Sequence, residues 1–348
     1  MKVLCPECEA QEVLSAERWR CDCGGAWEPV ERTGLSAAQI DRANFSIWRY
    51  RRFLGQERPT VQLGVGWTPL LSQSWEGREV LFKLEYMAPT GSFKDRGTEV
   101  MINILAAQGE THIVDDSSGN AGASVAAYAA QAGMRAEIFV PAYASPAKQA
   151  QIAVYGAEVR PIPGVRAEAK RAALEAAERG AALASHAYHP GFLAGQLTAA
   201  WELWEQLGHR APDGIVLPVG NGTLLLGIYR GFQRLHEAGL IADQPRLFAV
   251  QATACEPIYQ AFRNGRDAIE PVSTAPTVAS GIAIGQPVRA GQILAAVRAT
   301  DGAVFSVTEE KILKARNQLA RCGFYAEETS AAAMAALGEL GSTLSVGE

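Results

Sequence analysis

Short apolar runs typical of β-strands alternate with longer helical patterns along most of the chain. The predicted strands cover residues 80–84, 112–114, 136–140, 159–162, 215–219 and 247–250. Helical patterns lie between them, at about 93–108, after Asn120, from about Arg166 and from Leu224. Strand and helix in strict turn predict parallel sheets with right-handed crossovers, so the fold class is α/β with layered domains.

The N-terminal stretch follows a different pattern. Residues 1 to about 30 form a unit too small to be stabilised by a hydrophobic core alone, without a cross-link such as a bound metal. A polar-apolar helical pattern follows at 35–54, and 64–69 is rich in turn residues. We therefore predict a separate segment over 1–30, and a connector that leads into the main domains over 31–75.

Composition excludes several classes of protein. The 348 residues include 32 Lys+Arg and 37 Asp+Glu, giving a formal charge of -5, with 48% hydrophobic and 20% charged residues. These values predict a globular protein rather than a disordered or coiled-coil chain, and the mild acidity argues against nucleic-acid binding. The first residues lack the apolar core of a signal peptide and the apolar runs are short. The chain is therefore predicted to be cytoplasmic, without a membrane span.

Four of the six cysteines lie within the first 23 residues, and these are Cys5, Cys8, Cys21 and Cys23. In a chain predicted to be cytoplasmic, such a cluster indicates metal ligands rather than disulfides. Four thiolates suit tetrahedral zinc, although the second pair is one residue shorter than the usual Cys-x-x-Cys, with Gly24 at the expected ligand position. A structural zinc is predicted; a degenerate ribbon and a three-cysteine site stay open. A catalytic metal is not expected, because no histidine or carboxylate set accompanies the cysteines.

Lys94 stands at a predicted junction between a strand and a helix. The segment from Pro89 to Gly97 opens the helix, with Thr90 and Ser92 as candidate caps. The positive potential of a helix N-terminus favours the neutral, nucleophilic form of a lysine. Lys94 is therefore a candidate for a Schiff base with a carbonyl compound, and the alternative is an ordinary surface charge.

Two glycine-containing turns also lie between a strand and a helix. Ser117-Ser118-Gly119-Asn120 opens a helix, where backbone N–H groups can hold an anion such as a carboxylate. Gly220-Asn221-Gly222-Thr223 repeats the arrangement, and its glycines let the backbone approach a phosphate. Turn geometry alone explains either segment. Together with Lys94, the two turns predict a site for an anionic cofactor, an acidic substrate and a carbonyl group.

Five segments of the chain stand in the order seen in threonine synthases. They are Thr90–Gly97, Ser118–Asn120, Gly220–Thr223, Thr277–Ile282 with Gly285, and Glu328–Ala333. The chain resembles this family over roughly residues 60–340. The family consists of pyridoxal-phosphate enzymes of fold type II, the tryptophan synthase β-subunit fold. The resemblance implies a pyridoxal-phosphate-binding α/β core at 76–348 with a small domain inserted at about 98–200, and a homodimer acting on a small amino acid. The Cys-rich segment also resembles the zinc ribbon of some threonine synthases.

The resemblance assigns roles to individual residues. Lys94 would bind the cofactor and shuttle protons at the α and β carbons of the substrate, with Phe93 beside the cofactor ring and Asn120 on its phenolic oxygen. The cofactor phosphate would lie in the cradle of Gly220, Asn221, Gly222 and Thr223. The substrate carboxylate would be held by Ser117, Ser118 and Gly119, with His189 near the substrate. In threonine synthases the substrate is O-phosphohomoserine, which loses its phosphate before water adds at the β carbon.

The sequence departs from the family at two places. Phe192 occupies the position of an arginine that grips the substrate phosphate, which leaves Arg96, and His186 or His189 if protonated, as the nearby candidate cations. Family members also continue past the last helix into a strand and a turn whose threonine meets the pyridine nitrogen. This sequence stops at Gly341–Glu348, and two expectations stay open. Either the chain is shortened, which would leave part of the cofactor pocket open, or Thr329 or Ser330 supplies that hydrogen bond.

These departures keep three functions in view. Threonine synthase activity is the leading prediction. A threonine or serine dehydratase, or another β-elimination or β-replacement enzyme of the same fold, is the alternative that Phe192 favours. A catalytically inactive or truncated relative that acts as a binding module is the alternative of a different class.

Overall fold

The computed structural model describes residues 1–30, 36–56 and 58–340 of the chain. The chain divides into two compact units. The first consists of residues 1–71 and 82–202, and the second of 72–81 and 203–348. Within the described ranges, no helix has the length and apolar character needed to cross a bilayer.

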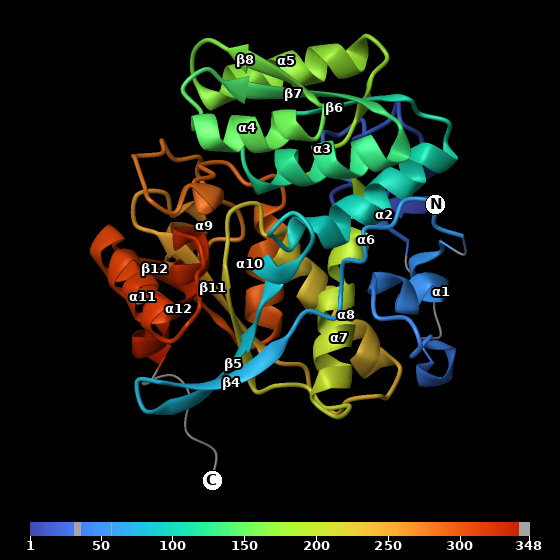
Figure 1. Ribbon diagram of the computed structural model, residues 1–348. Coiled ribbons are helices and arrows are strands. Elements are labelled where there is room, and N and C mark those ends of the chain that lie inside the picture. The colour runs from blue at the N-terminus through green and yellow to red at the C-terminus, as the bar shows by residue number, and fades with distance from the viewer. Residues whose placement is uncertain (31–35, 57, 341–348) are drawn as a thin grey trace. The chain divides into compact units, whose positions relative to one another are not determined.

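A four-stranded parallel sheet organises the first unit. Its order is β8-β7-β6-β9, and every neighbouring pair is parallel. The strands are β6 His112–Asp115, β7 Arg135–Pro141, β8 Glu158–Ile162 and β9 Ala182–Leu183. Helix α5 (Arg166–Glu178) covers one face, and α3 (Asn120–Ala132) and α4 (Pro146–Val154) cover the other (Figure 1). The predicted α/β layering is confirmed, and β6 begins at His112 as the apolar pattern predicts.

Two glycines let helices α2 (Lys94–Ala107) and α6 (Pro190–Gln196) approach each other closely. A Cβ atom on Gly195 would lie 2.1 Å from the carbonyl oxygen of Arg96, and one on Gly97 would lie 2.6 Å from the Phe192 ring. Any side chain at either position would force the helices apart. The crossing therefore places Phe192, fully buried, against the first turn of the helix that carries Lys94.

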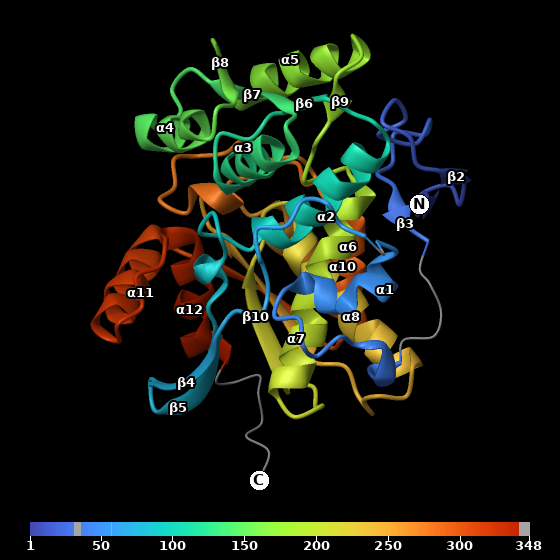
Figure 2. The ribbon, with the colours of Figure 1, turned by 45° about the vertical axis from the view of Figure 1, so that its right-hand side comes forward.

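The N-terminal segment is a small antiparallel sheet in the order β2-β1-β3. Its strands are β1 Lys2–Leu4, β2 Gln11–Val13 and β3 Glu28–Pro29. The segment lies against the rest of the first unit (Figure 2). Gln108 at the end of α2 donates a hydrogen bond to the Leu14 carbonyl (2.9 Å), and the Trp19 ring packs edge-on against Tyr188 at 5.0 Å.

The helical pattern predicted over 35–54 is broken into short pieces in the described residues. The structure has η1 Ala37–Gln39, η2 Ile47–Tyr50 and α1 Arg51–Leu54. Local side-chain hydrogen bonds account for the interruption, because Asn44 Oδ1 accepts from both the backbone and the hydroxyl of Ser46. Such bonds compete with the helical backbone pattern.

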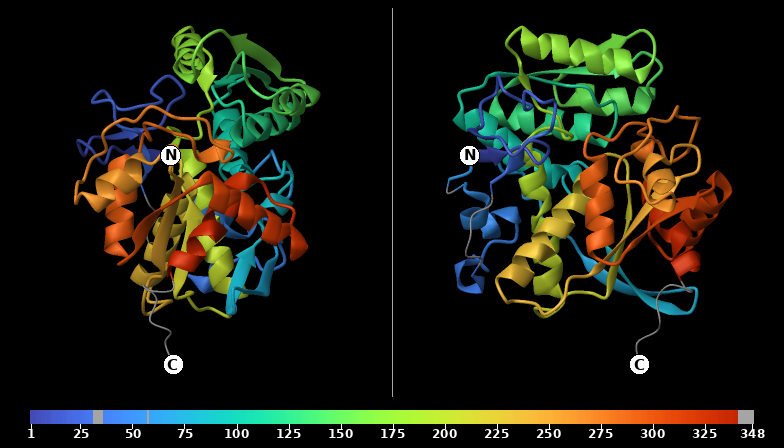
Figure 3. Two further views of the ribbon diagram at one scale, coloured as in Figure 1. Left: turned by 90° about the vertical axis from the view of Figure 1, so that its left-hand side faces the viewer. Right: turned by 180° about the vertical axis from the view of Figure 1, so that it is seen from behind.

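A three-stranded parallel sheet, β10-β11-β12, organises the second unit. The strands are β10 Gly214–Pro218, β11 Arg246–Ala252 and β12 Ala303–Val307. The helices are α7 Thr198–Gln206, which begins in the first unit, α8 Thr223–Glu237, α9 Pro257–Arg263, α10 Ala290–Ala299, α11 Glu309–Arg321 and α12 Glu328–Leu340. The red C-terminal helices lie on one side of the strands and the orange α10 on the other (Figure 3, left).

The strand predicted at 80–84 is placed differently from the prediction. It forms β5 (Arg78–Lys83), which pairs with β4 (Leu70–Trp75) as a two-stranded hairpin rather than joining a parallel sheet. Glu76 and Gly77 connect the strands with φ of 51° and 81°. Two positive φ values suit the tight turn of a hairpin, and this is why strand alternation alone misplaces the segment.

Candidate functional site

Lys94 is the first residue of α2, and the loop before it is tied down by Asp95. The buried Asp95 carboxylate accepts hydrogen bonds from the Thr90 backbone N–H (2.7 Å) and from the Ser124 hydroxyl on α3 (2.6 Å). Burial raises the pKa of Asp95, and these hydrogen bonds oppose the rise. The loop, α2 and α3 are thereby joined around one carboxylate. The sequence reasoning missed this role; the signal available was an acidic residue in the first turn of a helix, next to Lys94.

Aromatic rings surround the Lys94 amine. Its Nζ atom lies 4.5 Å from the centroid of the Phe93 ring and 5.8 Å from that of Phe192. A cation near a ring face is attracted by the ring quadrupole. The rings of Phe93, its neighbour in the chain, and of Phe192 on α6 thus both lie near the amine. The position of Phe93 beside a cofactor ring stays a prediction.

The Ser117–Asn120 turn connects β6 to the N-terminus of α3. The Ser117 N–H donates to Asp115 Oδ2 (3.2 Å), and the Gly119 N–H donates to the Ser117 hydroxyl (3.3 Å). Burial, and then the neighbouring Asp116, raise the pKa of Asp115 to about 8. The Asp115 carboxyl group next to the turn is therefore mostly protonated and uncharged at neutral pH. A Cβ atom on Gly122 would lie 1.9 Å from the Ser117 carbonyl oxygen, so the turn requires glycine there. An anion placed before α3 would meet the positive end of a 13-residue helix.

None of the three cations named as substitutes for the missing arginine is available to a phosphate. Arg96 is fully buried and ion-paired with Glu85 and Glu202, at 2.7 Å each. Burial would raise the pKa of Glu202, but Arg96 and Lys83 hold it at about 2, so the pairing is maintained. His186 and His189 are also buried. Burial lowers the pKa of His189 to about 3, and burial together with the Lys94 charge lowers that of His186 well below its usual value.

His189 caps α6 instead of presenting a charge. Its Nδ1 atom accepts a hydrogen bond from the Gly191 N–H at 3.1 Å. This arrangement requires a neutral ring, because a protonated imidazole has no acceptor. Contact between His189 and a substrate stays a prediction.

The low pKa of His189 predicts an acid-sensitive fold. Its folded-state pKa of about 3 lies below the unfolded value of about 6.5, so the unfolded chain binds more protons between these two values. The free energy of unfolding should therefore fall as the pH drops from about 6.5 toward 4. In His189→Asn, where the asparagine can still cap the helix, denaturant titrations should show a smaller decrease. An equal pH slope in both proteins would contradict the buried neutral histidine.

In the second unit, the turn from Gly220 to Thr223 leads from β10 into α8. Gly222 has a φ of +70°, and a Cβ atom on it would lie 2.2 Å from Ile293 Cδ1. A Cβ atom on Gly220 would lie 3.0 Å from Ile284 Cγ1 and 3.1 Å from Ile282 Cα. Gly222 is therefore required sterically and by its positive φ, whereas a side chain at Gly220 would need its neighbours to move by a few tenths of an ångström. The backbone of the turn leads into the N–H groups at the start of α8, which have no partner within the helix.

Thr329 lies beside the same turn. Its hydroxyl accepts a hydrogen bond from the Gly281 N–H at 3.2 Å, in the short helix η4 (Ser280–Ile282). The Cβ position of Gly220 lies 3.2 Å from the Gly281 carbonyl oxygen. Thr329 and the Gly220–Thr223 turn thus contact one glycine, whereas Ser330 is exposed. A threonine hydroxyl that accepts one bond keeps its proton for donation.

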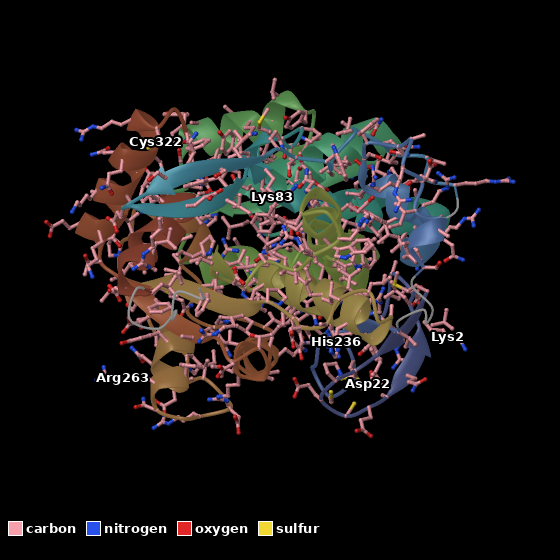
Figure 4. All side chains as sticks on the ribbon, turned by 90° about the horizontal axis from the view of Figure 1, so that it is seen from below. Lys2, Asp22, Lys83, His236, Arg263 and Cys322 are labelled. Carbon is pink, nitrogen blue, oxygen red and sulfur yellow. The ribbon has the colours of Figure 1, made fainter. Side chains whose placement is uncertain are left out.

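The four N-terminal cysteines form one cluster. The Sγ atoms of Cys5, Cys8, Cys21 and Cys23 all lie within 4.8 Å of one another, and the Cys5–Cys23 and Cys8–Cys21 distances are both 3.5 Å. Sulfur atoms gather beside the labelled Asp22 (Figure 4). Gly25 is required here too, because a Cβ atom on it would lie 2.8 Å from the Cys5 Sγ. The Cys-x-Cys spacing therefore still lets Cys23 reach the other three thiols.

Comparison with known proteins gives a consistent set of relatives. The family model described as pyridoxal-phosphate dependent enzyme matches residues 61–348. A threonine synthase of Methanosarcina acetivorans is 34% identical over 97% of this chain and 86% of its own length. One of Methanocaldococcus jannaschii is 32% identical over 92% and 83%. Among solved structures, a threonine deaminase of T.th. is 30% identical with a TM-score of 0.69, covering 80% of this chain and 89% of that one.

Proposed function

The chain belongs to the pyridoxal-phosphate dependent enzymes, and from this premise we propose that it is a threonine synthase. The reaction would convert O-phospho-L-homoserine and water into L-threonine and phosphate. The observation that carries the proposal is the 34% identity to a threonine synthase along 97% of the chain. The order of the lysine, glycine and threonine segments supports it.

Each unit, taken by itself, carries residues that suit one part of pyridoxal phosphate. The first unit offers the Lys94 amine for the aldehyde, the Phe93 ring beside it, and Asn120 at the first position of α3 for the phenolic oxygen. The second unit offers the Gly220–Thr223 turn for the phosphate and the Thr329 hydroxyl for the pyridine nitrogen. The steric need for glycine at position 222 supports a turn kept open for backbone contacts, since a Cβ atom there would collide with Ile293, and the tight packing around Gly220 agrees with it.

The proposed mechanism divides the work between the cofactor and the chain. When bound, the cofactor supplies an electron sink that stabilises negative charge developing on the substrate carbons. The Lys94 amine would accept and return protons at the α and β carbons, and the hydrogen bonds to Asp95 fix the loop that carries it. The Ser117–Gly119 turn would orient the carboxylate of the substrate. The C–O bond to the leaving phosphate would break before water adds to the β carbon.

A dehydratase is the second candidate, because Phe192 lies near the Lys94 amine where the family has an arginine. The similarity to a threonine deaminase structure supports the same alternative. A substrate screen of the purified holo-protein separates the two. O-Phosphohomoserine should yield phosphate and threonine in equal amounts, whereas ammonia release from threonine or serine as the dominant activity would favour the dehydratase.

We also propose that the four N-terminal thiolates hold a structural zinc ion. A Zn–S distance of about 2.3 Å in a tetrahedron separates the sulfurs by about 3.8 Å, and the sulfurs here already lie within 4.8 Å of one another. Two of the cysteines are buried and two exposed, which suits a closed site at the edge of a small segment. We further propose that the chain forms a homodimer, that it is located in the cytoplasm, and that residues of about 98–200 form a small domain inserted into the core. Analytical ultracentrifugation would test the dimer.

Removing one thiol should remove the metal. Elemental analysis of the purified chain should give one zinc per chain, and Cys21→Ser should lose it because a hydroxyl is a poor zinc ligand. Cys322→Ser, at an exposed position outside the cluster, should keep it. Equal metal content in both variants would contradict the assignment.

A further inference from the structure

The peptide bond that leads into Lys94 is held at both of its polar ends. Its N–H, on Lys94, donates to the Ser92 hydroxyl at 3.3 Å. Its carbonyl oxygen, on Phe93, accepts from the Arg96 backbone N–H at 3.2 Å and from the Gln196 side-chain amide at 3.3 Å. Because this peptide is planar and fixed at both ends, the direction in which the Lys94 side chain leaves the backbone is fixed as well.

Gln196 belongs to a different helix, α6, and close packing sets its place there. A Cβ atom on Gly97 would lie 2.7 Å from Gln196 Nε2, and one on Gly195 would lie 2.1 Å from the Arg96 carbonyl oxygen. The Gln196 side chain is fully buried. The two helices therefore leave the amide little room to move away from the Phe93 carbonyl.

The same face of α6 also lies near the Lys94 amine. Phe192 precedes Gln196 by four residues, one helical turn away on that face. The centroid of its ring is 5.8 Å from Lys94 Nζ. Gln196 thus contacts the backbone that carries Lys94, while Phe192 lies near the far end of the lysine side chain.

The chemistry of Gln196 indicates that its N–H group is the reason for a glutamine at this position. Its Oε1 atom is buried and has no hydrogen-bond partner among the residues that the structure describes. A buried acceptor without a partner is destabilising, and an apolar side chain of similar size would avoid that cost. Filling of space therefore does not account for the amide, whereas the hydrogen bond to Phe93 does.

Two other side chains hold the start of the same loop. Gln151 on α4 donates to the Thr90 carbonyl oxygen at 3.2 Å, and Asp95 accepts from the Thr90 N–H at 2.7 Å. These contacts fix the loop three residues before Phe93. Gln196 differs from them because it fixes the peptide of Lys94 itself.

We propose that Gln196 is a positioning residue, which holds the Phe93 carbonyl and thereby keeps the Lys94 amine aligned for proton transfer at the substrate carbons. This rests on the role of Lys94 in the proposed function. Gln196 acts through Lys94 and needs no contact with substrate or cofactor. Loss of its donor should therefore lower kcat and leave substrate binding largely intact.

Kinetics of the Gln196→Met holoenzyme test this assignment, because methionine has nearly the same length but no donor. With O-phosphohomoserine, kcat should fall by about 10- to 100-fold while KM changes by less than about threefold. The cofactor should stay bound, and its visible circular dichroism should change because its alignment changes. Gln108→Met is the matched control, since Gln108 at the other end of α2 donates its amide to the Leu14 carbonyl. This variant should match the wild type in kcat and in the cofactor spectrum.

Gln196→Glu separates a hydrogen-bonding role from a packing role. A protonated carboxyl group can donate to the Phe93 carbonyl and an ionised one cannot, and burial favours the protonated form. Relative to the wild type, kcat of Gln196→Glu should rise as the pH falls from about 8 to about 6, whereas that of Gln196→Met should stay a constant fraction. The other charged or titratable groups on α6, the first turn of α2, β3 and α7 include His189, Lys94, Asp95, Arg96, Glu28 and Glu202. Both variants and the wild type share these groups, so the comparison isolates the new carboxyl group.

Three results would overturn the positioning role. They are an unchanged kcat in Gln196→Met, a loss of kcat with equal losses of cofactor affinity and thermal stability, and equal deficits of Gln196→Met and Gln196→Glu at every pH. If Gln196→Met does not fold, the pH dependence of Gln196→Glu decides. Wild-type protein that releases no phosphate from O-phosphohomoserine would refute only the proposed function, because circular dichroism of the bound cofactor needs no substrate and still tests Gln196.

Discussion

Lys94→Ala is expected to abolish both turnover and the visible absorbance of the bound cofactor. The amine is the group assigned to bind the cofactor and to move protons at the substrate carbons, so kcat should fall by on the order of 10⁴-fold or more. The fold should persist, because the Asp95 hydrogen bonds to Thr90 and Ser124 do not involve the Lys94 side chain. Circular dichroism and thermal unfolding would verify this.

Borohydride reduction of the wild-type holoenzyme, followed by peptide mapping, identifies the modified lysine directly. The label should appear on the peptide that contains Lys94. Lys83 is the most informative comparison, since its ammonium is engaged with Glu202 and the Thr68 carbonyl oxygen in a buried ion-pair network. A label on Lys83 or Lys148 would contradict the assignment.

Gly222→Ala is expected to weaken cofactor binding by about 100-fold or more. The new Cβ atom would lie 2.2 Å from Ile293 Cδ1, so the turn before α8 would have to shift and would lose its aligned N–H groups. Titration of the apoenzyme with pyridoxal phosphate, followed by absorbance, measures the change in Kd.

Gly109→Ala is a control matched in backbone conformation. Gly109 has a φ of +86°, close to the +70° of Gly222, so both substitutions incur a similar left-handed strain. No atom lies within 4 Å of the Cβ position of Gly109, and the residue is exposed. Equal cofactor affinity in the two variants would show that Gly220–Thr223 is an ordinary turn and not a phosphate-binding element.

The sequence predicted the parallel-sheet elements because their signal is local. Apolar runs such as 136–140 and 247–250 fall within β7 and β11, and the turns with Asn120 and Thr223 mark the starts of α3 and α8. The strand at 80–84 was assigned to a parallel sheet instead of the β4–β5 hairpin, because the alternation of strands and helices does not indicate which strand pairs with which. The 36–54 region was misjudged because the hydrogen bonds between Asn44 and Ser46 override the hydrophobic period. The expectation for Gly341–Glu348 lies outside the described residues.

The parts of the candidate site that lie in sequence motifs could be predicted. The availability of the charged side chains could not, because tertiary contacts determine it. Lys94 and the two glycine turns were found from strand-to-helix junctions. By contrast, the sequence left Arg96 as a candidate ligand for the substrate phosphate. Its ion pairs with Glu85 and Glu202 show that its charge is used within the fold. Burial likewise removes the charge that His189 offered.

The fate of water oxygen tests the proposed reaction most directly. The holoenzyme would be incubated with O-phosphohomoserine in H₂¹⁸O, and the products analysed by mass spectrometry. Elimination of phosphate followed by addition of water at the β carbon predicts threonine with one ¹⁸O atom in its hydroxyl group and phosphate with none. Homoserine together with ¹⁸O-labelled phosphate would reveal simple hydrolysis of the ester, and would contradict the account of this chain as a threonine synthase.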